Sequence, residues 1–273
     1  MIKENVINNE QLSATAFSRQ SVVFDDIYAS NTIVHYKRER VRNHINQYLP
    51  PKSNILELNA GTGDDAIYFG RQMQNVHATD ISDGMLKQLV SKVKKNNLEK
   101  RITSEQCSFT DLGMLQNKGP FDLIFSNFAG LNCTDNLAHV LRSFKPLLAS
   151  EGLVTLVILP KFCLWETLIL FRGKFKTAFR RFNSSNGADA HVEGVHFKCW
   201  YYNPSYVADV MKDDFEVLNI EGLCTVVPPS YIENISEKHP TIYQRLVKLE
   251  SRLKNKWPWR LIGDYYIITL RKK

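Results

Sequence analysis

Residues 54–66 read Asn54-Ile55-Leu56-Glu57-Leu58-Asn59-Ala60-Gly61-Thr62-Gly63-Asp64-Asp65-Ala66. The apolar start is typical of a strand, the glycines of a tight turn, and the polar residues after them of the beginning of a helix. Glycine suits such a turn because a ligand can then approach backbone N–H groups with no Cβ in the way. The segment therefore predicts a strand, a ligand-binding turn and a helix.

Strand-like and helical patterns alternate along the rest of the chain. We expect strands at 54–58, 76–80, 102–107, 121–126, 152–159, 215–220 and 265–270, and helices at 85–95, 137–148, 204–211 and 240–254. This alternation predicts an α/β fold, Rossmann-like and doubly wound, with a mostly parallel seven-stranded sheet and a cap insertion after the fifth strand.

The 273 residues are interpreted as one domain in four parts. Residues 1–50 form an N-terminal helical segment that we expect to pack over the edge of the ligand site. Residues 51–160 are the ligand-binding core, residues 161–202 the cap insertion, and residues 203–273 the C-terminal part of the sheet.

The acidic residues near the turn indicate which ligand it binds. Asp80 ends the second strand, where such folds place a carboxylate to accept the hydroxyls of an adenosine ribose. A dinucleotide would lay its pyrophosphate against Asp64 and Asp65, whose negative charges repel phosphate but tolerate an ammonium and a sulfonium. This pattern favours S-adenosylmethionine over NAD.

Residues 20–160 resemble the class I S-adenosylmethionine-dependent methyltransferase superfamily, in particular the group related to ubiquinone and menaquinone C-methyltransferases. The first motif matches 57–63, with Asn59 in place of the first glycine, and Ser108 stands where the family usually has an acid that binds the adenine. The resemblance implies S-adenosylmethionine as methyl donor and S-adenosylhomocysteine as product. With Tyr28 from the N-terminal segment, the expected cofactor contacts are Tyr28, Glu57, Asn59, Ala60, Gly61, Thr62, Gly63, Asp80, Ile81, Met85, Ser108, Phe109, Asn127 and Phe128.

The insertion at 161–202 is rich in aromatic and cationic residues, and two interpretations of it stay open. It could cap a small aromatic, quinone-like or lipid-like acceptor, with His191 or His196 as a general base that takes a proton from the acceptor. Its acceptor contacts would then be Trp165, Glu166, Arg180 and Tyr201. Alternatively, the aromatic residues pack the cap on the sheet, the histidines lie at its surface, and Glu166 and Arg180 form a structural ion pair.

A formal net charge of +7 raises the alternative of an RNA methyltransferase. The basic runs at 37–42 and 87–100, however, are typical of solvated helix faces. Residues 127–130 read Asn-Phe-Ala-Gly instead of the Asn/Asp-Pro-Pro-aromatic turn of enzymes that methylate base amines, and Cys133 follows Asn132 instead of a proline. A third possibility is a non-catalytic S-adenosylmethionine-binding protein, which the departures at Asn59 and Ser108 permit.

The remaining sequence features limit where the protein is located and what it binds. No apolar run reaches the roughly 18 residues of a membrane span, and the N-terminus lacks the apolar core of a signal peptide, so we expect a cytoplasmic protein. The five scattered cysteines predict neither a disulfide framework nor a metal site. We expect a small-molecule substrate, no nucleic acid and, through the cap, peripheral contact with a membrane; the oligomeric state is left open.

Overall fold

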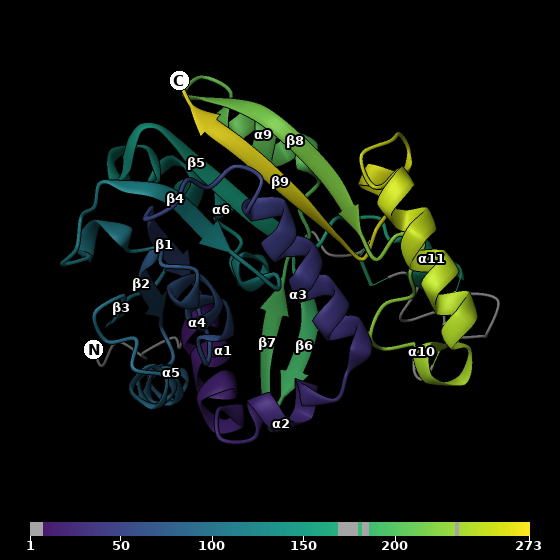
Figure 1. Cartoon of the computed structure of the whole chain (residues 1–273), viewed down its shortest axis with the longest axis horizontal. Helices are drawn as coiled ribbons and strands as arrows, with labels where there is room; N and C mark the ends of the chain where they lie inside the picture. The colour runs from purple at the N-terminus through teal and green to yellow at the C-terminus, as the bar shows by residue number, and fades with distance from the viewer. Residues whose placement is uncertain (1–7, 169–179, 182–185, 233–234) are drawn as a thin grey trace, which may run out of the picture.

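The computed structural model describes residues 8–168, 180–181, 186–232 and 235–273 (Figure 1). Its main sheet has seven strands in the order β3-β2-β1-β4-β5-β9-β8, in which β9 runs antiparallel to β5 and β8 and the other pairs are parallel. The predicted mostly parallel seven-stranded sheet is therefore confirmed. Its strands are β1 (Asn54–Leu58), β2 (Asn75–Asp80), β3 (Ile102–Gln106), β4 (Phe121–Ser126), β5 (Leu148–Ile158), β8 (Phe215–Leu223) and β9 (Tyr265–Lys272).

The sheet is buried on both faces, which explains why its central strands are rich in apolar residues. Leu56 and Leu58 of β1 point into one core, and Ile55 points into the other. The first core is covered by α6 (Leu137–Arg142) and α9 (Pro204–Met211). The second is covered by α3 (Thr32–Ile45), α4 (Asp64–Arg71) and α5 (Asp83–Lys95).

From the sequence, Pro146 is also expected to end the regular part of the helix at 137–148, and the helix does end before this proline. Helix α6 ends at Arg142, and a short 3-10 turn, η3 (Lys145–Leu147), contains Pro146 at its start. Proline has no N–H to donate and its ring clashes with the preceding turn, so the regular helix stops before it. Two further 3-10 turns, η1 (Leu112–Met114) and η2 (Gly130–Cys133), follow β3 and β4.

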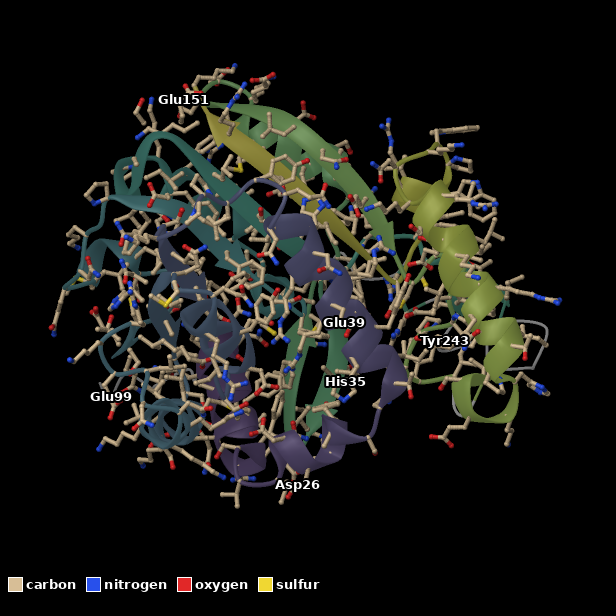
Figure 2. All side chains as sticks on the ribbon, viewed as in Figure 1. Asp26, His35, Glu39, Glu99, Glu151 and Tyr243 are labelled. Atoms are coloured by element: carbon tan, nitrogen blue, oxygen red, sulfur yellow. The ribbon has the colours of Figure 1, made fainter. Side chains whose placement is uncertain are left out.

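The N-terminal segment forms α1 (Asn9–Gln20), α2 (Phe24–Ala29) and α3. Helix α3 buries Val34, Lys37 and Val41 and exposes His35 and Glu39, which lie on its outer side in Figure 2. The interpretation of residues 37–42 as a solvated face is therefore wrong. Lys37 is 3% exposed, and the arginines after it form ion pairs with acids from other elements.

The insertion contains an antiparallel hairpin that the sequence did not suggest, β6 (Ala188–Val192) and β7 (Val195–Cys199). Val195 and Phe197 pack against Ala16 of α1. The other elements are α7 (Leu164–Leu168), α10 (Ile235–Lys238), α11 (Pro240–Leu253) and η5 (Trp259–Leu261). In the part of the chain that the structure describes, no helix has the length and apolar character of a membrane span.

Candidate functional site

A cavity of about 350 Å³ lies at the carboxyl ends of β1, β2 and β4, beneath α1, α2 and α3. Every predicted cofactor contact except Gly63 and Ser108 lines it. The expectation that the N-terminal segment packs over this edge is met, since eight of its residues contribute to the wall: Ser13, Ala14, Phe17, Phe24, Tyr28, Val34, Lys37 and Arg38. The rest of the wall consists of Glu57, Asn59, Ala60, Gly61, Thr62, Asp64, Asp65, Asp80, Ile81, Ser82, Met85, Phe109, Asn127, Phe128, Gly130, Cys133, Ser230 and Tyr265.

The turn after β1 takes a backbone conformation that few residues tolerate. Asn59, Gly61 and Gly63 have φ values of 46°, 56° and 81°. Gly63 is the N-cap residue of α4, and a Cβ at this position would lie 2.6 Å from Cγ of Leu89 on α5. Gly63 therefore sets the path of the turn and the approach of two helices, although it does not line the cavity.

Asn59 fits where the family pattern has glycine because asparagine tolerates a positive φ and its amide makes local hydrogen bonds. Its Nδ2 donates to the carbonyl of Asn127 at 2.9 Å, and its Oδ1 accepts from Ser126 Oγ at 2.6 Å. Gly130 leaves room for this side chain, since a Cβ there would lie 2.3 Å from Asn59 Cγ. Asn59 thus ties β1 to the end of β4.

Asp80 is held in a fixed orientation at the end of β2. Its Oδ2 accepts from the backbone N–H of Gly61 at 2.8 Å, and its Oδ1 accepts from that of Ser82 at 2.8 Å. The side chain is 9% exposed and lines the cavity. Burial raises its pKa, while the backbone hydrogen bonds act in the opposite direction.

Phe109 lines the cavity, but its neighbour Ser108 does not. Its hydroxyl donates to Glu10 of α1 at 2.6 Å, and Thr110 donates to the same carboxylate at 2.8 Å. The acid that the family pattern has at this position is thus replaced by a hydroxyl that anchors α1.

Glu57, in β1, is a buried carboxyl group with unused hydrogen-bonding capacity. It lines the cavity at 3% exposure, and its Oε2 has no hydrogen-bond partner among the described residues. Burial raises its pKa well above the ordinary value, and the nearby charge of Asp65 raises it further. A cationic group in the cavity would stabilise its ionised form.

Asp64 and Asp65 do not present unbalanced negative charge, as the sequence interpretation assumed. Asp64 forms ion pairs with Arg38 and Lys92, and Asp65 with Arg42 at 2.7 Å. Asp65 also accepts from Asn127 Nδ2 at 2.8 Å. Since cations neutralise this pair, a preference for a cationic ligand rests on Glu57 instead.

The opposite part of the wall is aromatic and cationic. The rings of Phe128 and Tyr265 meet edge to face with centroids 6.4 Å apart. Arg38 lies over the Phe128 ring, 5.2 Å from its centroid, and Lys37 Nζ lies 4.7 Å from the centroid of Tyr265. Tyr28 completes this end from α2. The cavity is therefore acidic near the glycine turn and basic near α3.

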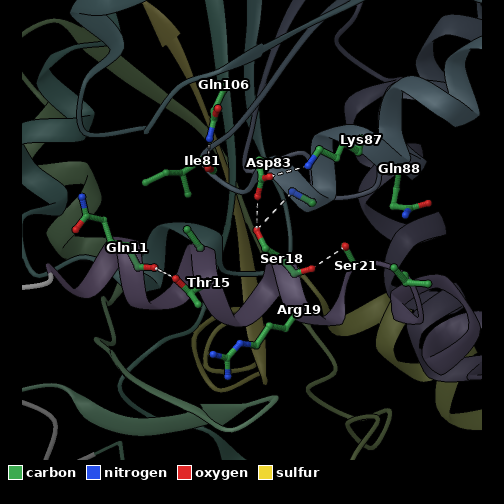
Figure 3. A pocket seen from close by; sticks show the side chains of 13 residues that line it. Gln11, Thr15, Ser18, Arg19, Ser21, Ile81, Asp83, Lys87, Gln88 and Gln106 are labelled. Carbon is green, nitrogen blue, oxygen red and sulfur yellow. Dashed lines mark hydrogen bonds and ion pairs between the residues drawn. The ribbon is translucent and has the colours of Figure 1, made fainter.

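Helix α1 also lines an open groove, whose wall includes Ser18, Asp83 and Lys87 (Figure 3). Ser18 Oγ bonds to Ser82 Oγ at 2.7 Å and donates to Asp83 at 3.0 Å. These contacts fix α1 on the start of α5, and a Cβ at Gly84 would lie 2.8 Å from the Ser18 carbonyl. The helix therefore covers the side of the cavity formed by Ile81 and Ser82.

His191 and His196 face each other across the β6–β7 hairpin, with ring centroids 4.4 Å apart. Both side chains are exposed, on the strand faces opposite the residues that pack on α1, and neither lines the cavity. This placement agrees with the alternative interpretation, in which the histidines lie at the surface of the insertion. We therefore assign them no role in proton transfer.

The four expected acceptor contacts also lie outside the cavity wall. Glu166 pairs with Arg180 at 2.5 Å and with Arg181 at 2.7 Å, and Arg181 pairs in turn with Asp264 at 2.8 Å. The ion pair between Glu166 and Arg180, which was the structural alternative to a role in acceptor binding, is thus present. Tyr201 lies beneath the guanidinium of Arg181, at 5.1 Å, and Trp165 is half-buried. Residues 169–179 and 182–185 of the expected cap are outside the described residues.

Sequence reasoning expected the N-terminal segment at this edge but named only Tyr28 from it, and it missed Ser230 and Tyr265. Lys37 carried the only usable signal, since it occupies the apolar side of α3 with Val34 and Val41. The surrounding basic residues masked that pattern. Ser230 and Tyr265 are distant in sequence from every motif, and the tertiary fold alone brings them to the cavity.

Comparisons with known proteins agree with this site. A family model described as a methyltransferase domain matches residues 55–152, and no curated protein sequence matches the chain. The fold is similar to that of 1,6-didemethyltoxoflavin-N1-methyltransferase from Burkholderia thailandensis, at TM-score 0.56 and 14% identity, over 96% of this chain and 88% of that one.

Two other solved structures are similar over most of their length. The geranyl diphosphate C-methyltransferase from Streptomyces coelicolor has TM-score 0.56 and 12% identity over 87% of this chain and 79% of that one. The cyclase SpnF has TM-score 0.61 and 13% identity over 97% of both chains. The two methyltransferases were crystallised with S-adenosylhomocysteine. The match to a methyltransferase domain is confined to residues 55–152, and over most of the chain the fold is similar to that of these methyltransferases.

Proposed function

We propose that this protein transfers the methyl group of S-adenosylmethionine to a small molecule bound in the same cavity. One observation carries the proposal: the residues of the glycine turn and Asp80 share a continuous cavity with Tyr28, Phe128 and Tyr265. A cavity shared in this way can hold two reactants in a fixed orientation.

The residues at the acidic part of the wall fit the cofactor. Asp80 offers a buried carboxylate to the ribose hydroxyls, and the unpartnered Oε2 of Glu57 offers an acceptor to the ammonium. Arg38, whose buried Nε has no hydrogen-bond partner in the described chain, offers a donor to the carboxylate. When bound, S-adenosylmethionine supplies an electrophilic methyl group. The protein's part is to orient both reactants, which can supply much of the rate enhancement without a general base.

Two alternatives are less consistent with the site. An RNA substrate would need an open approach to the strand ends, whereas α1, α2 and α3 cover them. One observation still supports the alternative of a protein that binds the cofactor without transferring its methyl group. The structurally similar SpnF is described as a cyclase. Turnover therefore has to be measured separately from binding.

The test compares wild type with Asp80→Ala, and with Asp213→Ala as an exposed control. Calorimetry with S-adenosylmethionine and S-adenosylhomocysteine measures binding, and transfer of a labelled methyl group to a small-molecule extract measures turnover. We expect Asp80→Ala to weaken cofactor binding by about 1.5–3 kcal/mol, because a charged hydrogen-bond acceptor is lost.

Equal affinity in wild type and Asp80→Ala would refute the site assignment. Cofactor binding without labelling of any extract component would support the non-catalytic alternative. Labelling of RNA instead, with binding that weakens steeply as salt is added, would support the RNA enzyme.

A further inference from the structure

Lys37 is a buried cation in the cavity wall and has few close hydrogen-bond acceptors among the described residues. Its ammonium donates one long hydrogen bond, 3.4 Å to Ser230 Oγ, and lies 3.9 Å from Asp264 Oδ2. Burial lowers its pKa, but Tyr265, Asp264 and the other neighbouring groups together raise it above the ordinary value, which favours the charged form. An ammonium group can donate three hydrogen bonds, so most of this capacity is unused among the described residues.

Lys37 shares its nearest carboxylate with a second cation. Asp264 pairs more closely with Arg181, at 2.8 Å, than with Lys37. Glu166 is shared between Arg180 and Arg181. Lys37 is therefore the more distant partner of a shared carboxylate, and a buried ammonium without a close counter-ion is costly unless an anion joins it.

We propose that the methyl acceptor carries an anionic oxygen group, a carboxylate or a phosphate, which binds Lys37 and Ser230 at the basic end of the cavity. This inference rests on the proposed function. The apolar body of the acceptor would contact the rings of Phe128 and Tyr265, and its methyl-accepting atom would lie toward the glycine turn.

The bound cofactor strengthens this preference. Bound at the glycine turn, S-adenosylmethionine would add the positive charge of its sulfonium to the same cavity, and an anionic acceptor would be stabilised by both cations. The effect is large in a buried site because the local dielectric constant is low. Lys37 thus acts as a specificity determinant, whereas Glu57 and Asp80 serve the cofactor.

The experiment titrates the protein saturated with S-adenosylhomocysteine by calorimetry with three probes: benzoate, its neutral isostere benzamide, and inorganic phosphate. We expect benzoate or phosphate to bind at least about tenfold more tightly than benzamide, and the better of the two identifies the kind of anion. Lys37→Met should remove this preference while S-adenosylhomocysteine affinity stays within about twofold of wild type. Lys248→Met, on the exposed side of α11, is the matched control.

Two results would overturn the inference. One is that neither anion binds better than benzamide. The other is that Lys37→Met binds the anion like wild type, or loses S-adenosylhomocysteine itself, which would assign the lysine to the cofactor. A thermal melt in the presence of S-adenosylhomocysteine checks that Lys37→Met is folded. Failure of the proposed function is distinguishable, since it shows as absent cofactor binding or absent methyl transfer in the wild type.

Discussion

Replacing Glu57 with glutamine separates the stability of this protein from its cofactor binding. The carboxyl group is buried, and its Oε2 lacks a hydrogen-bond partner in the described chain. A charged hydrogen bond to the cofactor ammonium is worth about 1.5–3 kcal/mol. We therefore expect Glu57→Gln to bind S-adenosylmethionine about 10- to 150-fold more weakly than wild type.

The same substitution should stabilise the free protein near neutral pH. The folded state raises the pKa of Glu57 well above its ordinary value of 4.5, so folding takes up a proton and wild-type stability falls as pH rises. The fall is about 1.4 kcal/mol per pH unit between the ordinary and the raised pKa. Glutamine does not titrate, so its advantage grows over this interval and disappears below pH 4.5.

Urea unfolding of the ligand-free proteins at pH 5, 6, 7 and 8, with calorimetry at the same pH values, measures both effects. Wild-type affinity should rise with pH as Glu57 ionises, and the affinity of Glu57→Gln should not. Glu99→Gln, at the surface in Figure 2, is the control for a glutamate change without burial. Equal cofactor affinity in Glu57→Gln and wild type would show that this carboxyl does not face the ammonium.

Three other changes test the packing around the site. Gly130→Ala should lower the free energy of unfolding in urea by about 1–3 kcal/mol, because the new Cβ displaces Asn59. Adding Asn59→Gly to the same chain should restore most of this stability. Additive losses in the double variant would contradict the clash. Glu250→Ala should lower the unfolding free energy by about 3–5 kcal/mol, since its carboxylate accepts from four backbone N–H groups at 224–227, and a loss below about 1 kcal/mol would count against that role. Although burial raises the pKa of Glu221, His44 and Lys254 lower it to about 2; its contribution to stability is therefore lost as pH falls from 4.5 toward 2, and Glu221→Gln should flatten the measured slope there.

The core of the fold was predictable because local patterns carry it. The strand at 54–58, the turn and Asp80 are adjacent in sequence, and a parallel sheet brings its strand ends to one edge whatever covers them. The end of α6 was less predictable, although Pro146 signalled it. The hairpin at 188–199 was missed because its short strands pack mainly on α1, a contact that no local pattern reveals.

The sequence by itself determined the strands, the glycine turn and the position of Asp80 at the end of the second strand, because each depends on residues within a few positions of one another. The tertiary structure alone decided which charges are balanced and which are exposed in the cavity. In the sequence, Asp64 and Asp65 cannot be distinguished from unpaired acidic residues. In the folded protein, arginines from α3 and a lysine from α5 neutralise them. Lys37 looks like a solvated lysine, yet folding buries it against Tyr265. Burial and charge pairing depend on distances between remote segments, and a linear pattern does not contain those distances.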